Sequence, residues 1–213
     1  MDLAVQDGQT MVCIGDSITD CGRRDAAAPF GNGYVSLLIE MVTAWWPERT
    51  IEYVNRGIGG DRVTGLRERW EEDVLARRPD WLSVLIGIND LHSYLGDPAA
   101  GVSVPLYREC YDDILTRTRE QTKAQIVLLD PFYIDTGESG DAFRAQVLQI
   151  IPEYIAVVHE MSERHGTRLV KLHDVFQNHL THRPAETFCP EPVHPDRAGH
   201  VIIAAELLRA LRS

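Results

Sequence analysis

Residues 11–22 read MVCIGDSITDCG, a short apolar run that stops abruptly at glycine, acidic and hydroxyl residues. Apolar side chains fill positions 11–14, as in a parallel strand that is buried on both of its faces. Gly15, Asp16 and Ser17 all favour turns, so this strand is predicted to end there. Ser17 is therefore either a turn residue or a nucleophile at the carboxyl end of a strand, and the rest of the chain decides between the two.

The alternation of strand and helix patterns continues along the whole chain. Further strands are predicted at residues 51–55, 81–86, 125–129 and 168–172, and helices at 34–46, 63–77, 105–121, 142–165 and 197–209. Strict alternation predicts an α/β fold with a five-stranded, mostly parallel sheet and helices on both of its faces. Because no linker, repeat or low-complexity tract interrupts the pattern, a single domain over residues 1–213 is expected.

Composition narrows the range of partners. The chain has 213 residues, of which 21 are basic and 32 acidic, and a net charge of -11. A surface of this charge repels phosphate backbones and anionic membranes, so we expect a small-molecule substrate and neither nucleic acid nor membrane as partner. MDLAVQDGQT, at residues 1–10, lacks the features of a signal peptide, and the four cysteines show no paired spacing, which predicts a reduced, cytoplasmic protein. Four tryptophans offer interface anchors, so a homo-oligomer is expected.

Glycines and hydrogen-bonding residues follow most of the predicted strands. In open α/β sheets ligands bind at the carboxyl ends of the strands, so the chemistry is expected in these loops. They read GDS at 15–17, NRGIGGDR at 55–62, GIND at 87–90 and, after a long irregular stretch, CPEPVHPDRAGH at 189–200.

The loops contain the parts of a nucleophilic site. A serine hydroxyl becomes a nucleophile only when a neighbouring base takes its proton, and His194, in a loop that prolines restrict, is the candidate base for Ser17. Glu191, three residues earlier, is placed to accept a hydrogen bond from the imidazole and fix its tautomer. The candidate donors to a developing oxyanion are the Ser17 N–H, the Gly60 N–H and the Asn89 side-chain amide.

Other residues are assigned to substrate contact or to structure. Asp16 and Tyr94 are predicted to contact the substrate, Tyr94 as a pocket wall in the loop after GIND. Three arginines at 62–69 and three glutamates at 68–72 predict a solvated, charged helix face that includes Arg69. His173, His179 and His182 match no common zinc spacing, and no metal site is predicted.

Each motif alone also has a purely structural interpretation. Gly-Asp-Ser is most often a turn, glycines 57–60 fit a tight connection, Asp90 fits a helix N-cap, and Glu191 fits a solvated loop acid. Taken together, four such motifs at the carboxyl edge of one sheet favour an acyl-transfer site instead.

GDSIT, NRGIGGD, GIND and EPVHPDRAGH resemble the four blocks of the SGNH (GDSL-type) hydrolase family, over residues 11–200. The resemblance implies a flavodoxin-like three-layer α/β/α sandwich, no metal or organic cofactor, and roles for Ser17 as nucleophile, Gly60 and Asn89 as oxyanion donors and His194 as base. One position departs from the family pattern, because Glu191 stands where the family has Asp. The stretches FGNGYVSLL at 30–38 and RPDWLSVLIGIND at 78–90 further resemble bacterial intracellular acetylxylan esterases.

The expected function is therefore a serine esterase that hydrolyses small acyl esters, acetyl above all, of carbohydrates such as xylo-oligosaccharides. Two alternatives are kept open. One is a lysophospholipase- or thioesterase-like hydrolase of longer acyl chains, and the other is an inactive carbohydrate-binding module.

Overall fold

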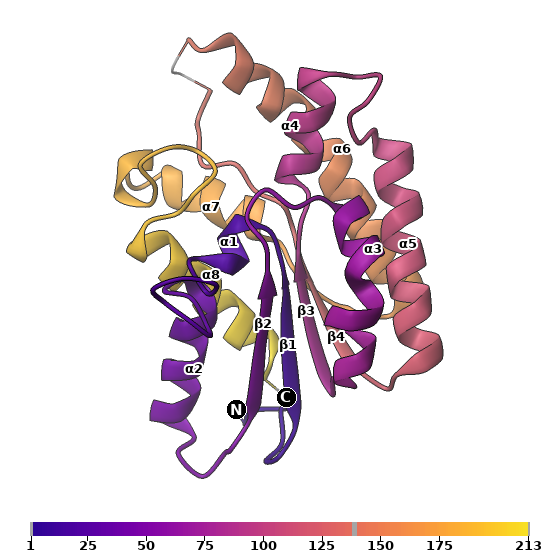
Figure 1. The fold of residues 1–213 in the computed structure, drawn as a ribbon. Helices are drawn as coiled ribbons and strands as arrows, with labels where there is room; N and C mark the ends of the chain where they lie inside the picture. Colours follow the sequence, from indigo (N-terminus) through magenta and orange to yellow (C-terminus); the bar gives the residue numbers. More distant parts are fainter. Residues whose placement is uncertain (1, 138–139, 213) are drawn as a thin grey trace.

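One five-stranded sheet forms the centre of the computed structural model, which describes residues 2–137 and 140–212 (Figure 1). Its strands are β1 (Thr10–Gly15), β2 (Glu52–Gly57), β3 (Trp81–Leu85), β4 (Gln125–Leu129) and β5 (Arg168–Val170). They lie in the order β2-β1-β3-β4-β5, and every pair of neighbours is parallel. This order is that of the flavodoxin-like fold, so the predicted fold class is confirmed.

The composition of these strands matches their positions in the sheet, with apolar strands at the centre and a more polar one at the edge. All five residues of β3 are buried, as expected for a central strand that is covered on both faces. In β1, every residue after Thr10 is buried. At the sheet edge, β2 is more polar and less buried, and its only fully buried positions are Asn55 and Gly57.

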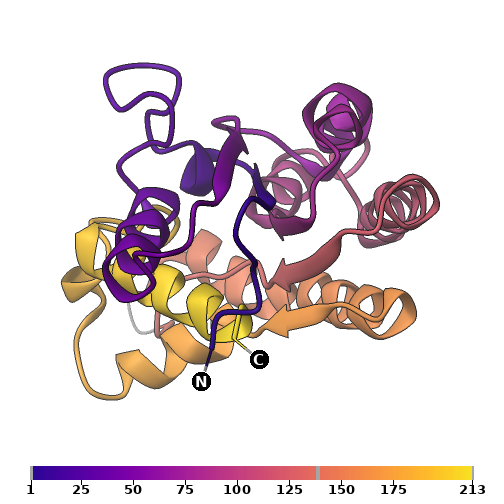
Figure 2. The same cartoon turned by 90° about the horizontal axis from the view of Figure 1, so that it is seen from below.

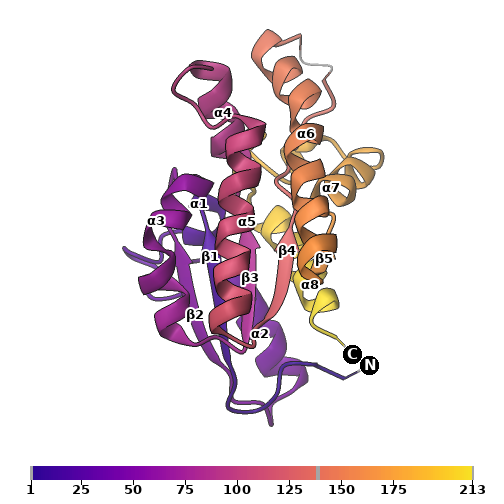
Figure 3. The ribbon, with the colours of Figure 1, turned by 90° about the vertical axis from the view of Figure 1, so that its right-hand side faces the viewer.

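The helices form the two outer layers. They are α1 (Ser17–Asp20), α2 (Tyr34–Trp45), α3 (Val63–Asp73), α4 (Ile88–Gly96), α5 (Val104–Gln121), α6 (Ala142–His165), α7 (Leu172–Leu180) and α8 (Arg197–Ala210). α2 packs on α8 over one face of the sheet, while α3, α5 and α6 pack side by side over the other. The view from below shows these layers edge-on (Figure 2), and the side view shows α3, α5 and α6 in a row (Figure 3).

Side-chain caps fix where several helices begin. Asp141 accepts from the N–H groups of Phe143 and Arg144 at the start of α6, and Asp196 does the same for Ala198 and Gly199 at the start of α8. The position of α8 matters for the site, because the loop that carries His194 leads directly into it.

A buried tryptophan, Trp70, lies between α3 and α5. Trp70 is 0% exposed, and its indole N–H donates to the Thr118 hydroxyl at 3.0 Å. Burying an aromatic of this size typically stabilises a fold by roughly 3–5 kcal/mol relative to alanine. Trp70 therefore belongs to the hydrophobic core, which contains no residue of the candidate site.

Three helices, α1, α4 and α7, were not predicted. α1 is a single turn that begins two residues after β1 ends, and α4 begins within the GIND loop. The last predicted strand was too long, because β5 ends at Val170 and α7 begins at Leu172. The predicted helix over 63–77 also ends early, at Asp73, and a short 3-10 turn covers Leu75–Arg77. Short amphipathic helices of nine residues give too few turns for a clear period.

In the described ranges, no helix combines the length and the apolar character that crossing a membrane requires.

Candidate active site

Ser17 lies where three neighbouring strands end. It is the first residue of α1, directly after β1, and β1 is flanked by β2 and β3 in the sheet. The order of the strands reverses between β1 and β3, which is the place where flavodoxin-like folds bind their ligands. The prediction that Ser17 follows the carboxyl end of a buried strand is therefore confirmed.

His194 lies within hydrogen-bond distance of Ser17. The Ser17 Oγ and the His194 Nε2 are 2.8 Å apart, although the two residues are 177 positions apart in sequence. On the other side of the ring, His194 Nδ1 lies 2.5 Å from Glu191 Oε1. Neutral imidazole with its proton on Nδ1 satisfies both contacts, since Nδ1 then donates to the carboxylate and Nε2 accepts from the hydroxyl.

Glu191 folds back toward His194 as the sequence predicted. Its two carboxylate oxygens also accept from the backbone N–H groups of Val193 at 3.0 Å and His194 at 2.7 Å. Partial burial raises the pKa of Glu191, but the hydrogen bonds from these N–H groups and from the imidazole outweigh burial and lower the pKa below its usual value. The Glu191 carboxylate is therefore ionised at neutral pH. The side chain is one methylene longer than the aspartate of the family pattern, and the turn that its hydrogen bonds to Val193 and His194 close accommodates this length.

The three predicted oxyanion donors follow three adjacent strands. Gly60 follows β2, Ser17 follows β1, and Asn89 lies at the start of α4, after β3. Within the described residues, the N–H groups of Ser17 and Gly60 donate to no protein acceptor. The Asn89 amide donates one hydrogen bond to the Asp61 carbonyl at 3.0 Å, which leaves its second N–H available. Gly60 has a φ of 78°, a conformation that favours glycine.

Two buried polar side chains hold the glycine loop against α1. Asp20 accepts from the Gly59 N–H at 3.0 Å. Asn55 donates to the Thr19 carbonyl at 2.7 Å and accepts from the Gly57 N–H at 2.8 Å. Close approach explains Gly57 itself, because a Cβ there would lie 2.2 Å from the Asp20 backbone nitrogen. Sequence reasoning missed the role of Asn55, although a polar residue at the end of a strand was the available signal.

Arg69 corrects the prediction of a fully solvated α3 face. Its side chain is only 15% exposed and forms ion pairs with Asp61 at 2.7 Å and Asp73 at 2.5 Å. The same guanidinium donates to the carbonyls of Arg56 and Gly15. Arginine suits this position because its planar group offers five donors, and it links α3 to the ends of β1 and β2. The helical charge pattern gave no sign that this arginine points inward.

Asp16 and Asp90 are buried carboxyl groups beside the site. Asp16 Oδ1 accepts from the Ile18 N–H at 3.0 Å and so caps α1, and Asp90 Oδ1 accepts from the Val63 N–H at 2.9 Å. Asp90 therefore caps α3. The structural interpretation of GIND made it the N-cap of its own helix, which is wrong. Burial raises the pKa of both groups to about 7. The structure gives Asp16 a positioning contact, and its contact with substrate stays a prediction.

Tyr94, the predicted pocket wall, is a half-buried residue of α4 whose backbone packs against Gly101. In the described part of the chain it makes no hydrogen bond or ring contact with Ser17 or His194, so its role also stays a prediction. His92, another α4 side chain, has a pKa that burial lowers and on which the charges of Glu191 and His194 also act.

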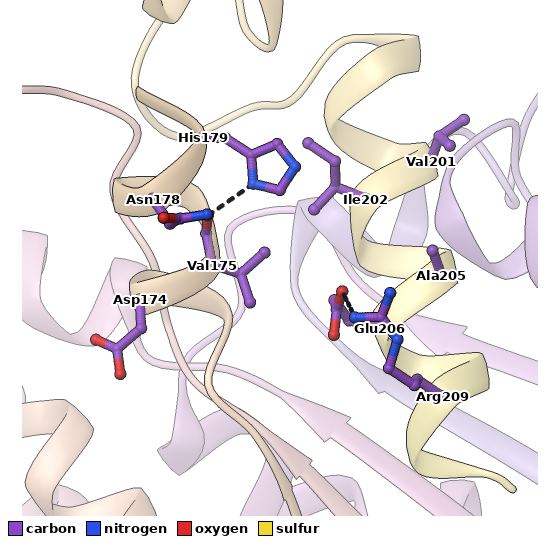
Figure 4. Close-up of a pocket in the computed structure, with 9 residues that line it drawn as sticks. All are labelled: Asp174, Val175, Asn178, His179, Val201, Ile202, Ala205, Glu206 and Arg209. Carbon is purple, nitrogen blue, oxygen red and sulfur yellow. Dashed lines mark hydrogen bonds and ion pairs between the residues drawn. The ribbon is translucent and has the colours of Figure 1, made fainter. Parts of the chain in front are cut away.

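A groove between α7 and α8 lies outside this constellation (Figure 4). It has a volume of about 520 Å³, and Val175, Val201 and Ile202 form its apolar walls. None of its lining residues belongs to the triad or to the oxyanion donors. The ring of His179 lies at its rim and bonds to the Val175 carbonyl of its own helix at 2.8 Å. Across residues 2–137 and 140–212, no group of three or more histidine, cysteine or acidic side chains is arranged to hold a metal ion.

Fold and site together define the class of the carboxylic ester hydrolases. The chain belongs to the GDSL-like lipase/acylhydrolase family, whose model matches residues 13–202. It is 34% identical to an acetylxylan esterase of Geobacillus stearothermophilus, over 98% of this chain and 96% of that protein.

Two solved structures are also similar to this chain over nearly its whole length. The crystal structure of Axe2, an acetylxylan esterase from G. stearothermophilus, is 34% identical and superimposes with a TM-score of 0.87, covering 98% of this chain and 96% of that chain. LAE5, an alpha/beta hydrolase enzyme from the metagenome of Lake Arreo in Spain, is 32% identical with a TM-score of 0.87, over 99% of this chain and 98% of that chain. The protein is therefore an esterase, and the alternatives of a longer-chain hydrolase and an inactive module are not favoured.

Proposed function

We propose that this esterase removes acetyl groups from carbohydrates, xylo-oligosaccharides among them, through an acyl-enzyme on Ser17. The observation that carries the proposal is the chain of contacts from Ser17 Oγ to His194 Nε2, at 2.8 Å, and from His194 Nδ1 to Glu191, at 2.5 Å. The sugar that carries the acetyl group is proposed by similarity, since Axe2 is an acetyl-xylooligosaccharide esterase.

In the proposed first half-reaction, Ser17 Oγ attacks the ester carbonyl carbon while His194 Nε2 takes the hydroxyl proton. The carbonyl oxygen becomes an oxyanion and accepts from the Ser17 N–H, the Gly60 N–H and the free N–H of Asn89. Glu191 stabilises the imidazolium that forms. The bond to the alcohol oxygen then breaks, and His194 returns the proton to that oxygen, which leaves acetyl-Ser17.

In the second half-reaction, water replaces the alcohol. His194 takes a proton from water as its oxygen attacks the acetyl carbon, and the same three donors stabilise the second oxyanion. When the bond to Ser17 breaks, His194 protonates Oγ, and acetate leaves. No cofactor enters either half-reaction. The proposed unit is one domain over residues 1–213, in keeping with the single sheet and its continuous core.

The decisive experiment measures acetate release from acetylated xylo-oligosaccharides by the wild type and by Ser17→Ala. We expect the substitution to lower kcat by roughly 10⁴-fold or more, because the acyl-enzyme has no nucleophile without the hydroxyl. Incubation with a serine-directed organophosphate should add its mass to the wild type and leave Ser17→Ala unlabelled. A folded wild type that takes no label would contradict the acyl-enzyme.

Chain length tests the identity of the acyl group. The rate on 4-nitrophenyl esters should fall steeply from acetate to octanoate, whereas a maximum at the longer chains would instead favour a lipase-like hydrolase. The predictions of a cytoplasmic location and of a homo-oligomer stay predictions, and light scattering of the purified protein measures the oligomeric state directly.

A further inference from the structure

Arginines gather around the glycine loop, residues 57–61, although the protein as a whole has a net charge of -11. Arg23 and Arg24 come shortly after α1, and Arg62 directly precedes α3. α1 and the start of α3 lie on opposite sides of the end of β2, where the glycine loop begins (Figure 1). The loop that carries the Gly60 donor therefore has basic residues near both of its ends.

Arg24 lies on the same side of the glycine loop as the nucleophile. A Cβ at Gly59 would lie 3.9 Å from Arg24 Nη2 and 4.0 Å from Ser17 Cβ, so all three residues border one small space. Gly59 and Gly60 are both exposed, and a Cβ at Gly60 would have no neighbour within 4 Å. A substrate bound at Ser17 can therefore extend over these glycines to the Arg24 side chain, which is 51% exposed.

One edge of the Arg24 guanidinium is occupied and the other is available. Nε donates to Asp20 Oδ2 at 2.9 Å, and Nη2 lies 2.8 Å from the same oxygen, which also accepts from the Gly59 N–H. Across residues 2–137 and 140–212, Nη1 donates to no protein acceptor. Nη1 and the second N–H of Nη2 can therefore bind a carboxylate through two parallel hydrogen bonds, while Asp20 holds the guanidinium in place.

Two further arginines add positive charge without a carboxylate partner. Arg62 is exposed and forms no ion pair in the part of the chain that the structure describes. It directly follows Asp61, whose carbonyl accepts from the Asn89 amide, so the chain at Arg62 passes close to an oxyanion donor. Arg23 donates to the Gly57 carbonyl at 2.6 Å and, among the described residues, has no ion pair either. Each of these two arginines leaves a positive charge that no ion pair neutralises.

The acidic groups around the glycine loop are buried and mostly engaged. The side chains of Asp20 and Asp61 are 9% and 13% exposed, and each is paired with an arginine. Burial raises the pKa of Asp16 and of Asp90 to about 7, so each is only partly ionised at neutral pH. The charged groups that a substrate meets over this loop are therefore basic, which favours a substrate with an anionic group.

Resting on the function proposed above, we infer that Arg24 binds a carboxylate of the substrate, with Arg62 adding charge at the other end of the glycine loop. An acetyl group carries no charge, so the carboxylate belongs to the alcohol part of the ester, as in an acetylated oligosaccharide that contains a uronic acid residue. Acidic acetylated sugars are then the preferred substrates. Arg24 is a specificity residue for them, and the transfer of the acetyl group itself proceeds on Ser17.

The test compares an acetylated oligosaccharide that contains a uronic acid residue with the same compound in which that carboxylate is a neutral primary amide. The wild type should hydrolyse the acidic compound with a kcat/KM about tenfold higher, mainly through a lower KM. Arg24→Gln should lose most of this preference. Arg24→Lys keeps the charge but not the two parallel donors and should retain part of it. Added salt should weaken the preference of the wild type, since salt screens exposed charges.

Arg183→Gln is the matched control, because Arg183 is an exposed arginine after α7 that lies outside the site, and it should keep the wild-type ratio of the two substrates. Arg62→Gln is an independent readout and should lower that ratio about threefold. Equal kcat/KM of the wild type on the two compounds, or an unchanged ratio in Arg24→Gln, would overturn the carboxylate subsite while the esterase stands. A wild type that releases acetate from neither compound would overturn the proposed function itself.

Discussion

Ser17, Gly60 and Asn89 follow the ends of three adjacent strands, whereas Glu191 and His194 lie on a loop that precedes α8. The first group is held by side chains that are themselves mostly buried, such as Asp20 and Asn55. In the second group the side chains are 43% exposed for Glu191 and 56% for His194, and the loop is held by backbone hydrogen bonds. The sheet therefore fixes the nucleophile and the oxyanion donors, while a local turn fixes the base.

Because of this difference, substitutions in the two halves of the site should affect stability and activity differently. The strand-end half depends on long-range packing, so changes there should alter stability together with activity. The loop half is nearly self-contained, since Glu191 closes its own turn within three residues. Changes there should alter activity with little effect on stability.

The largest expected effect is that of His194→Ala. Without the imidazole no group takes the Ser17 proton, and kcat on 4-nitrophenyl acetate should fall roughly 10⁴- to 10⁶-fold. The melting temperature should change little, because the side chain is exposed. His182→Ala, at an exposed position after α7, is the control. Residual activity above a few per cent would exclude His194 as the base.

Glu191→Gln should have the next largest effect. The amide keeps the shape of the side chain but loses its charge, so kcat should fall roughly 10³-fold. Glu191→Asp, which introduces the residue of the family pattern, should retain more activity than Glu191→Gln. Near-normal turnover in Glu191→Ala, with His194→Ala inactive, would show that the carboxylate has no triad role.

Asn89→Ala tests the strand-end half. Removing one oxyanion donor should lower kcat roughly 10²- to 10³-fold with little change in KM. Loss of the hydrogen bond to the Asp61 carbonyl should also lower the melting temperature by a few degrees, unlike the loop variants. Asn178→Ala removes an exposed amide of α7 and is the control. An unchanged kcat would remove Asn89 from the oxyanion hole.

The comparison of the two halves of the site also shows which parts of the fold and of the site the sequence predicts. Ser17, Gly60 and Asn89 are predicted site residues because each comes shortly after a predicted strand, and the end of a strand shows in the sequence as a change in composition. The fold is predictable for the same reason: the sequence predicts five strands in a mostly parallel sheet, and the structure has five strands that are all parallel.

The supporting contacts were not predictable. Arg69 sits in a run of charged residues that has helical spacing, and nothing in that run distinguishes the one guanidinium that points toward Gly15 and Arg56. The contacts of Asn55 and of His92 depend on which segments meet at the carboxyl edge of the sheet, and no local sequence pattern encodes that. The short helices α4 and α7 were missed because their two and a half turns end before a period is established.

Arg69→Met tests the long-range packing directly and should have a smaller effect on rate. The substitution takes the Arg69 guanidinium from Asp61 and Asp73, of which Asp73 keeps only a longer ion pair with Arg56 at 3.5 Å. This should lower the free energy of unfolding by about 3 kcal/mol, measured by urea denaturation. Because the loop that carries Gly60 loses one of its supports, the ion pair of Arg69 with Asp61, kcat should fall about tenfold. Arg67→Met removes an exposed ion pair with Glu109 and should cost less than about 1 kcal/mol. Equal stability losses in the two variants would show that Arg69 is not a special support.

Asp90→Asn should give the smallest effect, a change in stability that depends on pH. Burial raises the pKa of Asp90 to about 7 in the folded protein, above the value of an unfolded chain. Between about pH 4 and pH 7 the folded state therefore holds a proton that the unfolded state has released, and the free energy of unfolding falls as pH rises through this window. The asparagine cannot ionise, and its carbonyl oxygen can still accept from the Val63 N–H. Relative to the wild type, Asp90→Asn should gain on the order of 2 kcal/mol between pH 5 and pH 8, measured by urea denaturation at both values. Asp25→Asn, at an exposed position, should show the same small difference at both pH values, and a flat response of Asp90→Asn would mean that Asp90 is ionised in the fold throughout this range.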